Sequence, residues 1–204
     1  MLSFHQSNGG AAIACNRLVK ALRNQGLEVH HLVQEGSANP DVELLTTSIW
    51  DKLFNFLRFV AERLYFLPYE KNKSIRFLYN PGLFGKNIST HPVIQKVDII
   101  HLHFTNFGFL SMQNIAQLCA LGKPVVWTLH DMWAFTGGCH HSGTCENYQS
   151  KCGFCKEFMK HPAKNDLSNR LWEKKIKAFK QKKLSAITCS QWLLMRAKKS
   201  SILQ

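Results

Sequence analysis

Short apolar runs alternate with helix-like segments along most of the chain, and this alternation restricts the fold more than any other feature. The sequence predicts strands at 3–7, 27–33, 97–103, 123–130 and 184–190. It predicts helices at 11–26, 48–67 and 107–122, from a cap at Asp166 or Ser168 to about 183, and from 191 onward. Strands that alternate with helices indicate an α/β fold with a doubly wound, mostly parallel, Rossmann-like sheet.

The length and the composition are those of one globular domain. The chain has 204 residues, of which 45% are hydrophobic, so it can bury a core. We expect one domain over 1–204, with a cysteine-rich loop at 136–156 between the fourth strand and the basic helix. We also expect the remaining cysteines, Cys15, Cys119 and Cys189, to be small core residues.

The sequence indicates a cytosolic chain. Its first residues lack the charged and apolar regions of a signal peptide. The most apolar segment, 48–67, carries five charged residues, which is too many for a membrane span. In the cytosol disulfides are rare, so a cluster of cysteines favours metal binding.

The net charge of +13 is concentrated near the C-terminus. Residues 156–204 contain 13 Lys or Arg against three Asp or Glu. This segment suits an anionic partner such as nucleic acid, lipid headgroups or a phosphorylated substrate, or it is a solvated helix face. One alternative interpretation is a nucleic-acid-binding zinc protein that stacks bases on Phe154, Phe158 and Trp172.

Polar residues follow three of the predicted strands, where a parallel sheet binds its ligands. Gly9 and Gly10 follow the first strand and precede a helix, an arrangement that suits a phosphate or a plain tight turn. His101 and His103 end the third strand and share one face of it. The pair His130-Asp131 ends the fourth. Each histidine could serve acid–base or hydrogen-bonding chemistry, or be purely structural.

Four cysteines lie in the loop that follows. Cys139, Cys145, Cys152 and Cys155 have the spacing C-x5-C-x6-C-x2-C, and the last pair forms a chelating turn. Four thiolates satisfy tetrahedral zinc. Structural zinc, free thiols and disulfides all remain open from the sequence. In each case the cluster would stiffen the loop beside the site.

Several blocks of the sequence carry a resemblance to a known family. They are NGGAAIACNRLVKAL, DIIHLHFTNFGFLS, GKPVVWTLHDMWAFTGGCHHSGTCENYQSKCGFC and ITCSQWLLMRAKKS. In this order they resemble the N-terminal, acceptor-side half of a GT-B glycosyltransferase, and more narrowly the family 4 retaining enzymes of bacterial polysaccharide or glycolipid assembly. The block that begins at His130 is the most specific of them.

The resemblance implies roles for individual residues. Gly9 and Gly10 would face the diphosphate of a nucleotide-sugar donor. His130 would be the functional side chain at the reacting centre, and His103 would help to bind the substrate. Asp131 would orient His130 or line the acceptor pocket, and Ser190 would lie near the domain cleft. The implied reaction transfers a glycosyl group to an acceptor hydroxyl with retention and without a catalytic metal.

The resemblance also implies a second domain, which binds most of the donor and carries a basic residue followed by Glu-x7-Glu. The chain stops at Gln204, where the family would cross to that domain. We therefore expect an N-terminal half without transferase activity of its own, or a non-catalytic remnant, so its status as an enzyme stays open. The basic segment and the helix at 48–67 further suggest association with an anionic membrane at its inner face.

Overall fold

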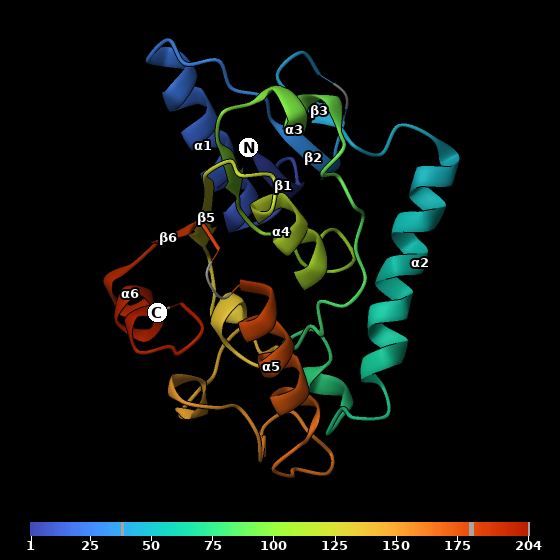
Figure 1. Ribbon diagram of the computed structural model, residues 1–204. Coiled ribbons are helices and arrows are strands. Elements are labelled where there is room, and N and C mark those ends of the chain that lie inside the picture. Colours follow the sequence, from blue (N-terminus) through green and yellow to red (C-terminus); the bar gives the residue numbers. More distant parts are fainter. Residues whose placement is uncertain (38, 180–181, 204) are drawn as a thin grey trace.

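A computed structural model describes residues 1–37, 39–179 and 182–203. Its centre is a sheet in which all six strands run parallel, flanked by helices (Figure 1). The strands are β1 (Leu2–His5), β2 (Leu32–Glu35), β3 (Glu43–Leu44), β4 (Ile100–Leu102), β5 (Val125–Leu129) and β6 (Leu184–Thr188). The predicted α/β class with a doubly wound parallel sheet is confirmed.

The strand order places a topological switch point at the middle of the sheet. The order is β3-β2-β1-β4-β5-β6, so the chain builds outward from β1 in one direction and from β4 in the other. Leu2 of β1 pairs with Leu102 of β4. In an open parallel sheet, the loops that leave two such strands diverge and open a crevice at the carboxyl ends.

The main helices are α1 (Gly10–Asn24), α2 (Ile49–Phe66), α3 (Pro92–Lys96), α4 (Met112–Cys119), α5 (Leu167–Phe179) and α6 (Gln191–Lys198). Three 3-10 turns lie at Lys73–Ile75, Trp133–Phe135 and Asn147–Gln149. Side-chain caps explain where several helices begin. Ser48 and Asp51 form a capping box on α2. At α5, Asp166 accepts from the backbone of Asn169, which confirms Asp166 as the cap.

The strand predicted at 97–103 covers only Ile100–Leu102, and the helix predicted to about 183 ends at Phe179, with 180 and 181 outside the described residues. Two further predicted boundaries are wrong for identifiable reasons. The strand predicted at 27–33 begins only at Leu32, since residues 27–31 have no strand pairing. The helix predicted at 107–122 begins at Met112, because Phe107 and Gly108 have φ of 56° and 87° and cannot be helical. The two-residue strand β3 lacks any apolar run and was not predicted.

Helix α2 stands along one side of the domain (Figure 1). Three of its side chains, Asn55, Glu62 and Phe66, are buried. The Glu62 carboxylate accepts hydrogen bonds from the backbone N–H groups of Gly82, Leu83 and Phe84 at 2.6–3.0 Å. One buried carboxylate therefore ties α2 to the irregular segment that follows it.

The hydrophobic core lies on both sides of the sheet and continues under the cysteine-rich loop. Cys15 and Cys119 are buried, as expected. Cys189 is exposed, which corrects that expectation, because it follows the outer strand β6. Within the described ranges, no helix combines the length and the hydrophobicity needed to cross a lipid bilayer.

Candidate functional site

The glycine turn after β1 presents open backbone at the switch point. Gly9 caps α1 with φ 86° and ψ 161°, and no side chain caps this helix end. A Cβ atom placed on Gly9 or Gly10 would meet no atom within 4 Å. The first N–H groups of a helix lack intrahelical partners and attract anions. The turn therefore leaves an open helix N-terminus of the kind that binds phosphate.

Two histidines lie at the same carboxyl edge of the sheet as this turn. His103 follows β4 and His130 follows β5, and His103 Nδ1 lies 3.0 Å from His130 Nε2 in a hydrogen bond. The ring of His101 stacks on that of His103 with centroids 4.8 Å apart, which confirms that the two share a face. His103 is buried, and its Nε2 has no hydrogen-bond partner among the described residues.

Burial keeps this histidine pair neutral. Desolvation above all, together with the neighbouring His101 and His130, lowers the pKa of His103 to about 3. Desolvation also lowers the pKa of His130, although the nearby Asp131 opposes the shift. At neutral pH both rings therefore carry one proton each, and the pair acts through hydrogen bonds rather than through charge.

Asp131 organises the start of the cysteine-rich loop. One of its oxygens accepts from the backbone N–H of Trp133 at 2.7 Å, and the other bonds His140 Nδ1 at 2.8 Å. The ring of His140 in turn contacts Phe104 and Phe107. Asp131 thus orients His140, and no direct hydrogen bond links it to His130.

Three hollows with shared lining residues lie around the glycine turn and the histidine pair. A cavity of about 320 Å³ is lined by Gly9, Gly10, Phe104 and Phe107 among others. Phe104 also lines the small hollow that contains His103, His130 and Asp131. The glycine turn and the histidine pair therefore line two hollows that share Phe104 at the carboxyl edge of the sheet.

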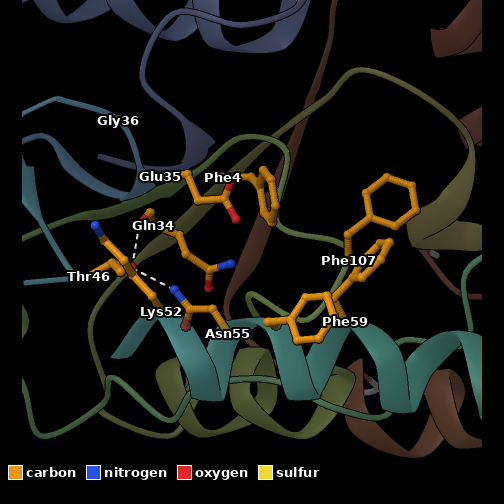
Figure 2. A pocket seen from close by; sticks show the side chains of 10 residues that line it. Phe4, Gln34, Glu35, Gly36, Thr46, Lys52, Asn55, Phe59 and Phe107 are labelled. Carbon is orange, nitrogen blue, oxygen red and sulfur yellow. Dashed lines mark hydrogen bonds between the residues drawn. The ribbon is translucent and has the colours of Figure 1, made fainter. Parts of the chain in front are cut away.

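A larger cavity, of about 500 Å³, shares Phe4 and Phe107 with the hollow beside the glycine turn. It lies between α2 and the ends of β1 and β2, and Figure 2 shows aromatic rings on one side of it and polar side chains on the other. The polar side chains include Gln34, Glu35 and Lys52. Aromatic walls with a few placed polar groups are typical of small-molecule sites.

Sequence reasoning missed the polar residues of this cavity. Asn55 donates to Thr46, and Thr46 donates to the Gln34 carbonyl, at 2.6 and 2.5 Å (Figure 2). The Gln34 side-chain oxygen is buried and has no partner within the described ranges. A signal for two of them existed, since Gln34 and Glu35 directly follow the apolar strand predicted at 27–33.

Ser190 has a structural role in addition to its predicted one. It follows β6, and its hydroxyl accepts from the backbone N–H of Leu193 at 3.2 Å as the cap of α6. The pairing of Leu129 with Thr188 brings it to the same edge of the sheet as His130. Its role in binding stays a prediction.

The four loop cysteines surround one cavity of about 320 Å³, and all are free thiols. Burial raises the pKa of Cys139 to about 12 and that of Cys155 to about 11. Among the described residues, no three His, Cys, Asp or Glu side chains stand close enough to hold one metal ion as they are placed. Zinc binding by this loop stays a prediction.

Two aromatic side chains of the basic segment are not available for stacking. Phe158 is 7% exposed and Trp172 is also 7% exposed, and both pack in the core. Phe154 alone of the three is exposed, at 59%. The segment folds as α5, β6 and α6 of the same domain. This arrangement speaks against the nucleic-acid-binding interpretation.

Comparison with known proteins gives a family for this arrangement. The model of Glycosyltransferase Family 4 matches residues 8–195, which include the glycine turn, both strand-end histidines and the cysteine-rich loop. A relative from Escherichia coli (strain K12), the "Putative colanic acid biosynthesis glycosyl transferase WcaC", is 27% identical over 114 residues.

That match covers 51% of this chain and 28% of the relative, so the chain corresponds to only part of the relative's length. No solved structure matches the chain significantly.

Proposed function

The chain belongs to Glycosyltransferase Family 4, and we propose from this that its site serves the transfer of a glycosyl group from a nucleotide-sugar to an acceptor hydroxyl, with retention of configuration. The observation that carries the proposal is the position of the glycine turn and the His103–His130 pair. The glycine turn follows β1, His103 follows the adjacent strand β4, and His130 follows β5, the next strand along. The switch point of the sheet lies between β1 and β4. Ligands of such sheets bind there.

The diphosphate of the donor lies against the N-terminus of α1 in this proposal. Gly10 and the next two residues offer backbone N–H groups that no side chain caps. Gly9 holds a backbone conformation that other residues rarely adopt. The helix N-terminus stabilises the negative charge that develops on the leaving nucleoside diphosphate.

His130 donates a hydrogen bond from Nδ1 to the substrate. The Nε2 atom of His103 is buried and has no hydrogen-bond partner among the described residues. Leaving this nitrogen unprotonated costs less free energy than burying an unpaired N–H group there. This favours the tautomer in which His103 Nδ1–H donates to His130 Nε2. His130 then carries its proton on Nδ1. His103 acts as a positioning residue that fixes this tautomer.

The acceptor occupies the cavity between α2 and the strand ends. The aromatic side chains of this cavity suit the apolar face of a sugar. The side-chain oxygen of Gln34, which has no partner among the described residues, can accept a hydrogen bond from a sugar hydroxyl. The printed name of the Escherichia coli relative refers to colanic acid biosynthesis. For this chain we propose the broader class, assembly of a polysaccharide or a glycolipid.

In this proposal, residues 1–204 by themselves do not catalyse glycosyl transfer. The resemblance assigns most of the donor contacts to a second domain, and the described residues form a single sheet with its helices. Catalysis requires both substrates to be held in the reacting geometry. The purified 204-residue chain should release no nucleoside diphosphate from nucleotide-sugars, and robust release would overturn this part of the proposal.

A direct test of the acceptor site uses binding rather than turnover. Oligosaccharides titrated into the 204-residue chain should shift the amide signals of Gln34 and of Asn55 in NMR spectra. Gln34→Ala should abolish this binding, whereas Gln149→Ala, which lies in the cysteine-rich loop, should not. Shifts confined to other parts of the chain would place the acceptor elsewhere.

Helix α2 supports a location at a membrane surface. Its outward face carries Trp50, Leu53, Phe54, Leu57 and Leu64, which are 42–65% exposed. These residues follow helical spacing and lie opposite the buried Asn55 and Glu62. An exposed apolar stripe on a chain of net charge +13 suits the interface of an anionic bilayer. We place the acceptor reaction at the inner, cytoplasmic face of such a membrane.

A further inference from the structure

The cysteine-rich loop brings four sulfur atoms to the wall of one cavity. Cys139, Cys145, Cys152 and Cys155 all line it, and its volume is about 320 Å³. The loop is tied at several points to the rest of the domain. Tyr79 pairs with Cys139, Asp166 accepts from the backbone N–H of Cys155 at 2.8 Å, and Asn169 donates to the Cys152 carbonyl at 2.7 Å.

The turn from Cys152 to Cys155 has an unusual backbone. Phe154 has φ 47°, a left-handed conformation that costs a residue with a side chain roughly 1 kcal/mol or more. Its ring is 59% exposed, so packing does not compensate for that cost. Backbone strain of this kind is concentrated at functional sites, ligand clamps among them.

A buried cation lies beside the same cavity. Lys175 is completely buried and donates to the carbonyl oxygens of Trp133 and Thr136. Its ammonium also lies 3.7 Å from the centre of the Trp133 ring. Within the described ranges, no carboxylate pairs with it. Thr136, which accepts from this ammonium, also lines the cavity of the four cysteines.

A buried ammonium without a counter-charge is costly, and so is a buried group of thiolates. We propose that Cys139, Cys145, Cys152 and Cys155 bind one zinc ion as four thiolates, and that Lys175 is the counter-cation of this centre. Each thiol gives its proton to solvent when the metal binds. One zinc ion with four thiolates carries a net charge of −2, which the ammonium reduces to −1.

The sulfurs line the cavity but do not yet converge in it. Binding therefore includes rotation of the cysteine side chains and contraction of the cavity around the ion. The bound ion would cross-link the four cysteines and so fix the loop that begins at His130. His140, next to Cys139, would then hold its hydrogen bond to Asp131 more rigidly. The zinc ion is structural, since four protein ligands leave no open position for substrate.

The first test is the metal content of the 204-residue chain, purified under reducing conditions and measured by inductively coupled plasma mass spectrometry. We expect close to one zinc ion per chain. Cys155→Ser should lower the zinc content to near zero, and Cys189→Ser, which removes an exposed thiol outside the cluster, should leave it unchanged. A wild-type chain free of zinc would overturn the proposal.

Cobalt gives a second readout that does not depend on the folding of a variant. Co²⁺ added to the metal-free wild-type chain should produce the intense thiolate-to-metal absorption of a tetrahedral sulfur site. Absence of that absorption, or mass spectrometric detection of disulfides among the four cysteines, would contradict the assignment.

Lys175→Met tests the counter-cation, because methionine keeps much of the volume and removes the charge. We expect zinc binding to weaken roughly 10- to 100-fold, as measured by competition with a chelator. Lys174→Met, at the preceding and half-exposed position of α5, is the matched control and should leave the affinity unchanged. Equal affinities of both variants and the wild type would remove Lys175 from the centre.

Discussion

The hydrogen bond between His103 and His130 determines which nitrogen of His130 faces a ligand. The sequence predicted both residues at a strand end, because polar residues after apolar strands are a local pattern. The hydrogen bond itself joins strands β4 and β5 and depends on their register, which pairs Leu102 with Trp127. Pattern alone could not supply it.

Other features of the site depend on distant segments. The cavity beside Gln34 exists because α2 lies across the ends of β1 and β2. Nothing near Gln34 in the sequence indicates that helix. Likewise, Asp131 was expected to orient His130 or to line the acceptor pocket. Its hydrogen bond goes to His140, nine residues along the loop, and it lines the hollow that contains His130.

The two glycines of the turn make a matched pair for mutation. Gly9→Ala should reduce the free energy of unfolding by about 1–3 kcal/mol, because φ 86° and ψ 161° are nearly restricted to glycine. Gly10→Ala should leave stability unchanged or slightly higher, because Gly10 begins α1 and has open space around it. Urea denaturation of both variants measures the difference, and equal losses would contradict this account of the turn.

At the scale of elements, strong hydrophobic periodicity predicted most of the helices. An error in where a helix begins came from backbone conformations that the periodicity does not reveal. The helix predicted from residue 107 is shorter because Phe107 and Gly108 are left-handed. Helix α2 was predicted within one residue at each end, but its environment was not. The structure buries Asn55, Glu62 and Phe66 on one side of this helix and exposes an apolar face on the other.

That face gives a prediction for α2. In flotation experiments the 204-residue chain should rise with anionic vesicles more than with neutral ones, since both apolar burial and net positive charge contribute. The double variant Trp50→Ser/Phe54→Ser should lose most of this binding. Both residues are more than half exposed, so the fold should tolerate the change.

Leu27→Ser is the control for α2, because Leu27 is 55% exposed but lies outside this helix. It should float like the wild type. Equal flotation of the α2 variant and the wild type, or no preference for anionic vesicles, would exclude α2 as the membrane contact.

For the whole molecule, buried histidines predict sensitivity to acid. Burial lowers the pKa of His31 to about 4 and that of His103 to about 3 from the ordinary 6.5. Between these values and 6.5 the unfolded chain binds more protons than the folded chain, so stability rises with pH. Each histidine contributes up to about 1.4 kcal/mol per pH unit there.

Urea denaturation at pH 7 and at pH 5 measures this loss. His31→Gln should reduce the difference between the two pH values, because glutamine keeps a polar group near Ser3 but does not titrate. His31 bonds Ser3, which lines the cavity beside the glycine turn, so the comparison measures stability and not substrate binding. The same loss in both proteins would show that other groups cause the acid sensitivity.

The central claim is that this domain supplies the reacting centre of a family 4 glycosyltransferase, with His130 as its hydrogen-bond donor. The most direct test measures release of nucleoside diphosphate from a nucleotide-sugar by the native polypeptide that carries these residues, in the presence of acceptor. The account predicts release by the wild type and a roughly 10²- to 10³-fold slower release by His130→Ala, the scale for loss of one charge-stabilising donor. His161→Ala, an exposed residue far along the chain, should retain the wild-type rate. Equal rates for His130→Ala and the wild type would contradict the claim.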